Sequence, residues 1–367
     1  MQLPKSYNIT ELKIIAKNFC DELKKAYLNL PSSLSFFINP LPKPQVVLPN
    51  KIIQVMVFGG TIFKSTSVKS PDFKFKNDKI KKLKTPFFSN EKIFFDFIIN
   101  QLNKKADYLA INFAYPLKPI LRNNRLDGKL LYSTKEHNFG TLIGKNIGEE
   151  IKKYIYQKQK RIIKVTIIND VVALLLSGIF KNENWQNLCA GIVGTGTNFA
   201  FFIDKKTAVN LESGNFNKFP LTLTGKIINQ NSSEPNKQLF EKEIAGAYLY
   251  LHYNLIKNKD NFNTPLKSTI ELSKKAKKGD ILAKKILEHS ASLIASQIAG
   301  TYQFKKLQTN NPHLKLKIIM EGSLFWQGYQ YQNYIRRYLK FLDGLDKKIE
   351  FIKIKNSQIL GVIKLLI

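Results

Sequence analysis

The sequence of 367 residues is long for a single hydrophobic core, so its length favours two domains. A hydrophobic content of 44%, with 12% aromatic residues, is enough for sizeable cores and excludes a disordered composition. The sequence has no long uncharged apolar run, and its N-terminus lacks a basic segment followed by an apolar one. We therefore expect no membrane span, no signal peptide and a cytoplasmic location.

The net charge of +31 comes almost entirely from lysine, which is spread along the chain. Nucleic-acid binding proteins rely on arginine forks, so we do not expect nucleic-acid binding as the main role. The charge still favours polyanionic ligands. Cys20 and Cys189 lie in apolar contexts and are expected to be buried free thiols rather than a disulfide or a metal pair. Nothing in the sequence indicates the oligomeric state.

The first half of the chain opens with a capping box, Asn8 and Glu11, which predicts a helix from about residue 9 to 28. The proline-rich segment 31–50 is predicted to be a connector. An apolar strand at 52–58 meets Gly59-Gly60 and returns from Ile62, which predicts a β-hairpin rather than a strand-to-helix Walker loop. Further predicted elements are a helix at 93–102, a strand at 108–113, a helix at 147–156 and a strand at 164–168.

The second half begins with Asn169-Asp170 at the carboxyl end of a strand, followed by an apolar helix at 171–180. A second glycine-turned hairpin joins strands at 189–193 and 197–203, so the chain carries a weak internal duplication. Later segments are predicted to be helices at 239–257, 268–276 and 281–306, a strand at 315–320, a helix through residue 339, a strand at 349–354 and a short final helix.

Both glycine turns carry threonines beside the glycines. Glycine in a hairpin turn has a structural explanation, because it supplies positive φ. Backbone N–H groups in a tight turn also form an anion nest, to which threonine hydroxyls add donors. Two such nests facing each other across a cleft would grip a polyphosphate. Both interpretations stay open for either turn alone.

Three carboxylates are candidates for chemistry. Asp170 follows a strand end, where ligands bind in open α/β sheets. It is either the N-cap of the next helix or a general base that takes a proton from an alcohol. Glu212 lies in a loop and Glu241 opens a helix. Each suits the hydrogen bonding of neighbouring sugar hydroxyls, and a helix-dipole role would also explain Glu241.

In chain order, eight segments resemble the hexokinase/glucokinase family: FGGTIFK, NFAYP, LDGKLLYSTKEHNFG, IINDVVALLL, IVGTGTNFA, NLESGNF, QLFEKEIAG and MEGSLFW. The resemblance spans nearly the whole chain. It implies an α/β fold of two actin-like (ribonuclease H-like) domains, each built on a five-stranded sheet, closing over a central cleft. The implied N-terminal region is 1–168 and the C-terminal region 169–367, with the final helix, about 357–367, returning to the first.

The resemblance also implies transfer of the γ-phosphoryl group of ATP to the 6-hydroxyl of glucose or a related hexose, a carbohydrate phosphorylation step of glycolysis. The implied cofactors are ATP and Mg²⁺, with Mg²⁺ bound mainly through ATP and no direct protein ligand to the metal. Asp170 matches the family's general base. The matched sugar contacts are Thr134, Lys135, Asn169, Asn198, Glu212 and Glu241. The matched nucleotide positions are Gly59, Gly60, Thr61 and Lys64 in the first phosphate loop, Gly194, Thr195, Gly196 and Thr197 in the second, and Gly322 and Ser323 beside the adenosine.

The chain departs from the family pattern at several of these segments. Val57 stands where the family has the aspartate that helps to hold magnesium. The other departures are Ile62 for asparagine, Lys64 for arginine, Ala114 for serine, Ser213 for tryptophan and Glu321 for aspartate. Losing that aspartate removes transition-state stabilisation. A catalytically weak or inactive sugar-binding or regulatory protein is therefore an alternative, and a basic scaffold for polyanions is another.

Overall fold

The chain forms two compact units, each assembled from separate segments. The computed structural model describes residues 7–44, 47–59, 62–132, 138–181, 183–257 and 265–366. Unit 1 comprises Met1–Phe36, Cys189–Phe199 and Leu211–Lys353, and unit 2 comprises Phe37–Leu188, Ala200–Asn210 and Ile354–Ile367. The units differ from the expected division at residue 168, because the chain enters and leaves each of them more than once.

Helices and strands alternate along most of the chain, as in a mixed α/β protein. The α-helices are α1 (Ile9–Tyr27), α2 (Glu91–Gln101), α3 (Ile147–Gln159), α4 (Asp170–Phe180), α5 (Leu223–Gln230), α6 (Leu239–Ile244), α7 (Leu249–Lys257), α8 (Thr269–Lys277), α9 (Ile281–Gln308), α10 (Ser323–Gln327), α11 (Tyr331–Phe341) and α12 (Ser357–Lys364). The strands are β1 (Phe37–Pro40), β2 (Ile52–Phe58), β3 (Ile62–Lys69), β4 (Lys81–Lys84), β5 (Tyr108–Phe113), β6 (Leu117–Arg122), β7 (Arg125–Leu130), β8 (Lys164–Asn169), β9 (Leu188–Val193), β10 (Thr197–Asp204), β11 (Thr207–Asn210), β12 (Leu316–Glu321) and β13 (Ile349–Ile352).

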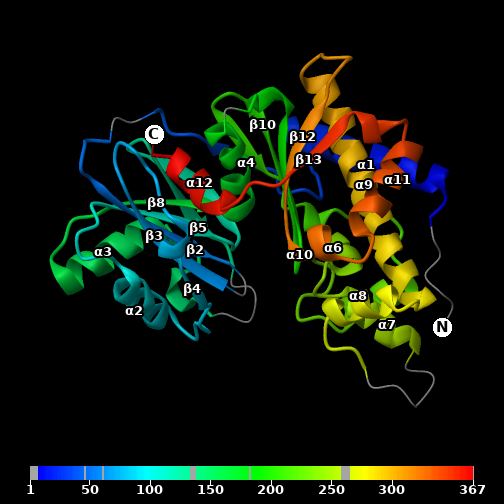
Figure 1. The fold of residues 1–367 in the computed structure, drawn as a ribbon, viewed down its shortest axis with the longest axis horizontal. Coiled ribbons are helices and arrows are strands. Elements are labelled where there is room, and N and C mark those ends of the chain that lie inside the picture. Colours follow the sequence, from blue (N-terminus) through cyan, green and yellow to red (C-terminus); the bar gives the residue numbers. More distant parts are fainter. Residues whose placement is uncertain are drawn as a thin grey trace. The chain divides into compact units, whose positions relative to one another are not determined.

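Unit 2 contains a five-stranded sheet in the order β4-β3-β2-β5-β8. β2 and β3 form the predicted antiparallel hairpin, and β5 runs parallel to both β2 and β8. One face buries an aromatic-rich core against α2 and α3, in which Phe58 and Phe113 pack with rings 5.9 Å apart. Helices α4 and α12 cover the other face (Figure 1). Because both faces are covered, the central strands are apolar on both sides.

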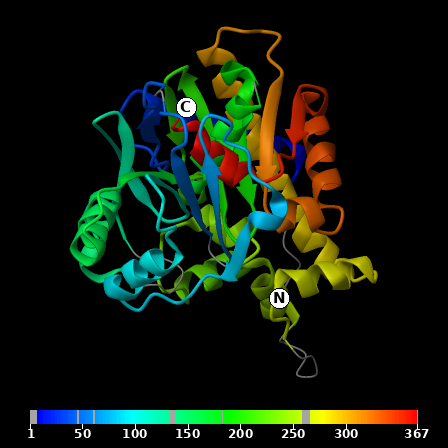
Figure 2. The same ribbon diagram turned by 60° about the vertical axis from the view of Figure 1, so that its left-hand side comes forward.

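In unit 1, the long helix α9 packs along α1 and α11 (Figure 2). The side chain of Asn8 caps α1 and Glu11 completes the capping box, as the sequence predicted. α1 and α9 approach closely at Gly300, where an added β-carbon would lie 2.5 Å from the carbonyl oxygen of Ala16. This close approach gives α1 a fixed place on α9, although α1 and α9 are far apart in sequence.

The second sheet has six strands in the order β1-β11-β10-β9-β12-β13. The expectation of five strands was wrong for this sheet, because β1 joins its edge by antiparallel pairing with β11. Apart from β1, the two sheets have equivalent strand orders. The order β11-β10-β9-β12-β13 in one sheet corresponds to β4-β3-β2-β5-β8 in the other. That shared order agrees with the weak internal duplication predicted from the two glycine-turned hairpins.

Several elements were not predicted, or were predicted with the wrong extent. β1 lies in the segment expected to be a connector, and β4 lies in a lysine-rich segment for which no element was predicted. α5 was missed, and the helix expected at 239–257 is split into α6 and α7. Both cysteines are buried and free, as predicted. Within the described ranges, no helix combines the length and the apolar character that crossing a membrane would require.

Helices α12 and α4 are in backbone contact at Gly361, where an added β-carbon would lie 1.6 Å from the carbonyl oxygen of Ala173. We expect Gly361→Ala to push α12 off α4 and to lower the free energy of unfolding by about 1–3 kcal/mol, as overpacking of a core does. Urea unfolding followed by circular dichroism measures the loss. Lys364→Ala, on the same helix, is the control, and equal unfolding midpoints for the two variants would contradict the prediction.

Candidate functional site

The second glycine turn joins β9 to β10 in unit 1. The N–H of Gly194 donates to the carbonyl of Gly196 at 2.9 Å, which closes the turn. The segment between α6 and α7 lies on the turn, because Gly246 N–H donates to the Gly194 carbonyl at 2.8 Å and Ala247 N–H donates to the Thr195 carbonyl at 3.0 Å. Because the N–H groups of residues 246 and 247 donate to the turn, they do not form helical hydrogen bonds, and this explains the break between α6 and α7.

The turn at Gly322 and Ser323 lies against the same end of β9. Gly322 has φ 113°, a conformation that side chains rarely adopt. A β-carbon there would lie 2.1 Å from the carbonyl oxygen of Val193, and a β-carbon on Gly194 would lie 3.2 Å from Gly322 Cα. Ser323 is exposed and begins α10. Two of the predicted nucleotide turns are therefore in contact, and the absence of side chains is what allows the contact.

Glu241, on α6, lies beside the second glycine turn. Its Oε2 accepts a hydrogen bond from Thr197 N–H at 2.8 Å. A β-carbon on Gly196 would lie 2.7 Å from the same oxygen, and one on Gly214 would lie 3.0 Å from Glu241 Cβ. Burial raises the pKa of Tyr248 to about 12, and the Glu241 carboxylate adds to that rise. A predicted sugar contact and a predicted phosphate turn are thus joined directly.

Asn198 and the Glu212 loop form the neighbouring part of this region. Asn198 Oδ1 accepts hydrogen bonds from Phe199 N–H at 2.8 Å and from Ser213 N–H at 3.3 Å. Glu212 has φ 49° and ψ 49°, the left-handed conformation, which is uncommon for a residue with a side chain. Strain of this kind persists where the surrounding structure holds it, often at ligand sites. Since Gly214 touches Glu241, the loop brings Glu212 into the same region.

Asn169 and Asp170 belong to unit 2, at the junction of β8 and α4. The helix begins at Asp170, one residue earlier than predicted, and its N-cap is Asn169. Asn169 Oδ1 accepts a hydrogen bond from Val171 N–H at 3.1 Å, and Asp170 Oδ1 accepts from the same N–H at 2.8 Å. Asn169, and not Asp170, is therefore the N-cap of α4. The Asp170 side chain remains partly exposed.

The first glycine turn also lies in unit 2. Gly59 N–H donates to the Ile62 carbonyl at 3.3 Å, and Lys64 is partly exposed. Gly60, Thr61, Thr134 and Lys135 lie outside the described residues. Val57 is 1% exposed and pairs in register with Asn112 on β5. Asn112 is fully buried, and neither polar atom of its side chain has a hydrogen-bond partner among the described residues. No local sequence pattern indicated that this amide would be buried.

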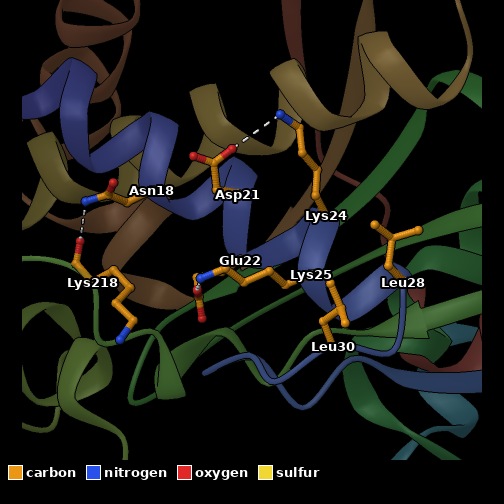
Figure 3. Close-up of a pocket in the computed structure, with 8 residues that line it drawn as sticks. All are labelled: Asn18, Asp21, Glu22, Lys24, Lys25, Leu28, Leu30 and Lys218. Atoms are coloured by element: carbon orange, nitrogen blue, oxygen red, sulfur yellow. Dashed lines mark hydrogen bonds and ion pairs between the residues drawn. The ribbon is translucent and has the colours of Figure 1, made fainter.

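A separate pocket of about 460 Å³ lies beside the carboxyl end of α1 (Figure 3). Its carboxylates are already paired, Asp21 with Lys24 at 3.3 Å and Glu22 with Lys25 at 2.8 Å. No residue predicted for the site lines this pocket. The lining residues are Asn18, Asp21, Glu22, Lys24, Lys25, Leu28, Leu30 and Lys218. This pocket is therefore separate from the residues predicted for the site.

Comparison with known sequences identifies relatives over part of the chain. Residues 188–257, which contain the second glycine turn, Glu212 and Glu241, match the family model described as Hexokinase. Hexokinase-1 of Spinacia oleracea is 29% identical over 164 residues, covering 40% of this chain and 32% of that protein. Hexokinase-9 of Oryza sativa subsp. japonica is 31% identical over 159 residues, covering 38% and 30%. The match thus spans about a third of the length of these curated relatives.

Comparison with solved structures covers nearly the whole chain. A crystal structure of hexokinase matches with a TM-score of 0.74 and 18% identity, over 98% of this chain and 96% of that one. A hexokinase from Schistosoma mansoni complexed with glucose matches with a TM-score of 0.74 and 17% identity, over 98% and 95%. These matches establish the fold of two actin-like α/β domains. Together with the sequence matches, they show that the chain is similar to hexokinases.

Proposed function

We propose that the chain is an ATP-dependent hexose kinase that transfers the γ-phosphoryl group to the 6-hydroxyl of glucose or a related hexose. The observation that carries this proposal is the hydrogen bond from Thr197 N–H to Glu241 Oε2. It links a carboxylate suited to sugar hydroxyls with a turn suited to phosphate. In the proposed reaction Asp170 accepts the proton of the hydroxyl, while Asn198, Glu212 and Glu241 hold the other sugar hydroxyls.

The residues of unit 1 fit ATP. Gly194, Gly196 and Gly322 allow the turns to pack closely, because any β-carbon there would crowd a neighbour. The N–H groups of tight turns suit a polyphosphate. Mg²⁺ is proposed to be carried on the phosphates of ATP, where it would neutralise charge.

A second candidate function is a sugar-binding or regulatory protein with weak or no catalysis. It is favoured by Val57, whose side chain is buried and apolar at the position where the resemblance predicts an acid. The sugar-binding residues Asn198, Glu212 and Glu241 would serve that function equally well. The two functions differ only in whether phosphoryl transfer occurs.

Formation of hexose 6-phosphate by the purified protein tests the proposed function. The assay uses magnesium-ATP with a panel of hexoses, and ATP without hexose measures background hydrolysis. Hexose-dependent turnover is expected. If turnover is absent while hexoses still raise the melting temperature, the kinase proposal fails and the sugar-binding protein takes its place. If hexoses have no effect at all, both functions fail.

The Glu241 carboxylate gives a more specific prediction. Replacing it by Gln removes the charge while keeping the size of the side chain, so hexose binding is expected to weaken by about 10- to 100-fold, the effect of losing hydrogen bonds to a charged group. Isothermal titration calorimetry with glucose, in the absence of nucleotide, measures the change. Glu288→Gln, which removes a partly exposed carboxylate paired with Arg337, is the control. An unchanged affinity in Glu241→Gln would contradict the role.

A further inference from the structure

The short helix α6 carries three consecutive charged residues that point in different directions. Glu241 lies against the glycine turn. Lys242 is 2% exposed, and its Nζ donates to the carbonyl of Glu234 at 2.7 Å and to Asn229 Oδ1 at 3.0 Å. Glu243 is fully buried against α9. A helix of six residues has little stability of its own, so contacts on its buried sides decide where Glu241 lies.

Glu243 forms a buried hydrogen bond with His289 of α9. His289 Nε2 lies 3.0 Å from Glu243 Oε1, and the two side chains are 6% and 0% exposed. Burial alone would raise the pKa of Glu243, but the hydrogen bond with His289 and the other interactions of the carboxylate with His252, His289 and Thr222 together outweigh it, and the pKa lies below its ordinary value. The carboxylate therefore stays ionised inside the unit. A charge in this position is costly to leave unpaired, so the pair holds α6 to α9 in one geometry.

The surroundings of this hydrogen-bonded pair leave it little freedom to move. The ring of Tyr7 stacks on His289 with centroids 5.2 Å apart, and the Tyr7 hydroxyl donates to the Pro220 carbonyl. On the other side, a β-carbon on Gly225 would lie 2.0 Å from Glu243 Oε2, so α5 fits against the carboxylate. The stacking of Tyr7 on His289 and the close packing of α5 against Glu243 fix the positions of both side chains.

Two more polar contacts fix the carboxyl-terminal half of α6. Ser290, next to His289 on α9, donates through its hydroxyl to the Ile244 carbonyl at 2.7 Å. The ring of His252, on α7, lies with Nε2 3.0 Å from the Lys242 carbonyl and Nδ1 2.7 Å from Thr224 Oγ1. Burial lowers the pKa of His252, which favours its neutral form. On α9, the side chain that contacts the Glu243 carboxylate is His289.

We propose that Glu243 and His289 are positioning residues for hexose binding, acting through Glu241. The two carboxylates lie two residues apart on one short helix, so any tilt or rotation of α6 that follows loss of the buried hydrogen bond moves Glu241 relative to Thr197. This inference rests on the proposed function, because it assumes that Glu241 contacts the hexose. It differs from a purely structural role, in which the pair would stabilise the unit without affecting sugar affinity.

A double-mutant cycle tests the inference in the full-length protein, with glucose binding measured by calorimetry without nucleotide. Glu243→Gln and His289→Gln are each expected to weaken glucose binding by about tenfold, because pairs in contact couple strongly. In a protein that already carries Glu241→Gln, Glu243→Gln is expected to weaken glucose binding by less than a further factor of about two, since its effect passes through Glu241. Melting temperatures confirm that each variant is folded. Glu288→Gln, beside His289 but paired with Arg337, controls for loss of a paired carboxylate.

Each outcome decides one question. The positioning role is overturned if Glu243→Gln and His289→Gln lower only the melting temperature and leave glucose affinity unchanged. It is also overturned if the loss of glucose affinity in the double variant equals the product of the losses in Glu241→Gln and Glu243→Gln. In both cases the proposed function stands. Should Glu243→Gln fail to fold, His289→Gln alone decides by the same comparison. If the wild-type protein binds none of the hexoses, the proposed function is overturned and the positioning role falls with it.

Discussion

Asp170→Ala is expected to abolish phosphoryl transfer while hexose affinity stays within about tenfold, or roughly 1.4 kcal/mol. The physical reason is that a general base contributes about 10²- to 10⁴-fold to proton transfer. The N-cap of α4 is provided by Asn169, so removing the Asp170 side chain leaves the helix start capped. Measuring hexose 6-phosphate formation and glucose binding on the same preparation separates the two effects.

Asp170→Asn is the matched variant for this prediction. The amide keeps an oxygen that accepts from Val171 N–H, as Asp170 Oδ1 does at 2.8 Å, but it is not basic. Both variants should therefore lose transfer to a similar degree. Full activity of the Asp170→Asn variant would contradict the role of Asp170 as general base. A folded Asp170→Ala variant that no longer binds hexose would assign Asp170 to sugar binding instead.

Gly322→Ala is expected to lower kcat/KM for ATP by at least about 100-fold, because a β-carbon would lie 2.1 Å from the Val193 carbonyl oxygen and 2.8 Å from Gly194 N. Contacts under 3 Å cannot persist, so the turn must move away from β9. Misplacement of reacting groups by about 1 Å lowers the rate of an enzyme by about 100-fold. Initial rates at varied ATP measure the change. Glucose affinity should stay near the wild-type value, since Glu241 is not displaced.

Gly279→Ala controls for the conformational strain of this substitution. Gly279 has φ 104°, close to the 113° of Gly322, but nothing lies within 4 Å of the position of its β-carbon. The control therefore carries the strain of an unfavourable φ without the collision. Comparable losses in kcat/KM for ATP in the two variants would show that the contact between the Gly322 turn and β9 has no part in nucleotide binding.

Much of the secondary structure could be predicted where local pattern and packing agree. The capping box of α1 and the hairpin of β2 and β3 are confirmed because their residues carry the signal themselves. β4 could not be predicted, since its sequence KKLK has little strand character and becomes a strand by pairing with β3. β1 likewise depends on pairing with β11, which is more than 150 residues away in the sequence.

The candidate site shows the same limit. The motif residues of the second glycine turn and Glu241 could be selected from the sequence, and the structure joins them by a hydrogen bond. Their roles stay predictions. Glu243 and His289 could not be selected, because a charged residue on a helix ordinarily faces solvent and the two are 46 positions apart. Burial and pairing are properties of the folded unit, so no local pattern reports them.

The packing of α12 on α4 and on β2 and β5 has a consequence for synthesis of the chain on the ribosome. The strand β2 emerges about 300 residues before α12, a delay of roughly 15 to 60 s at common translation rates. During that interval, one apolar face of the nascent sheet has no α12 to cover it. The folding of unit 2 is thus completed only after α12 has been translated, and we expect the nascent protein to depend on chaperones during that interval.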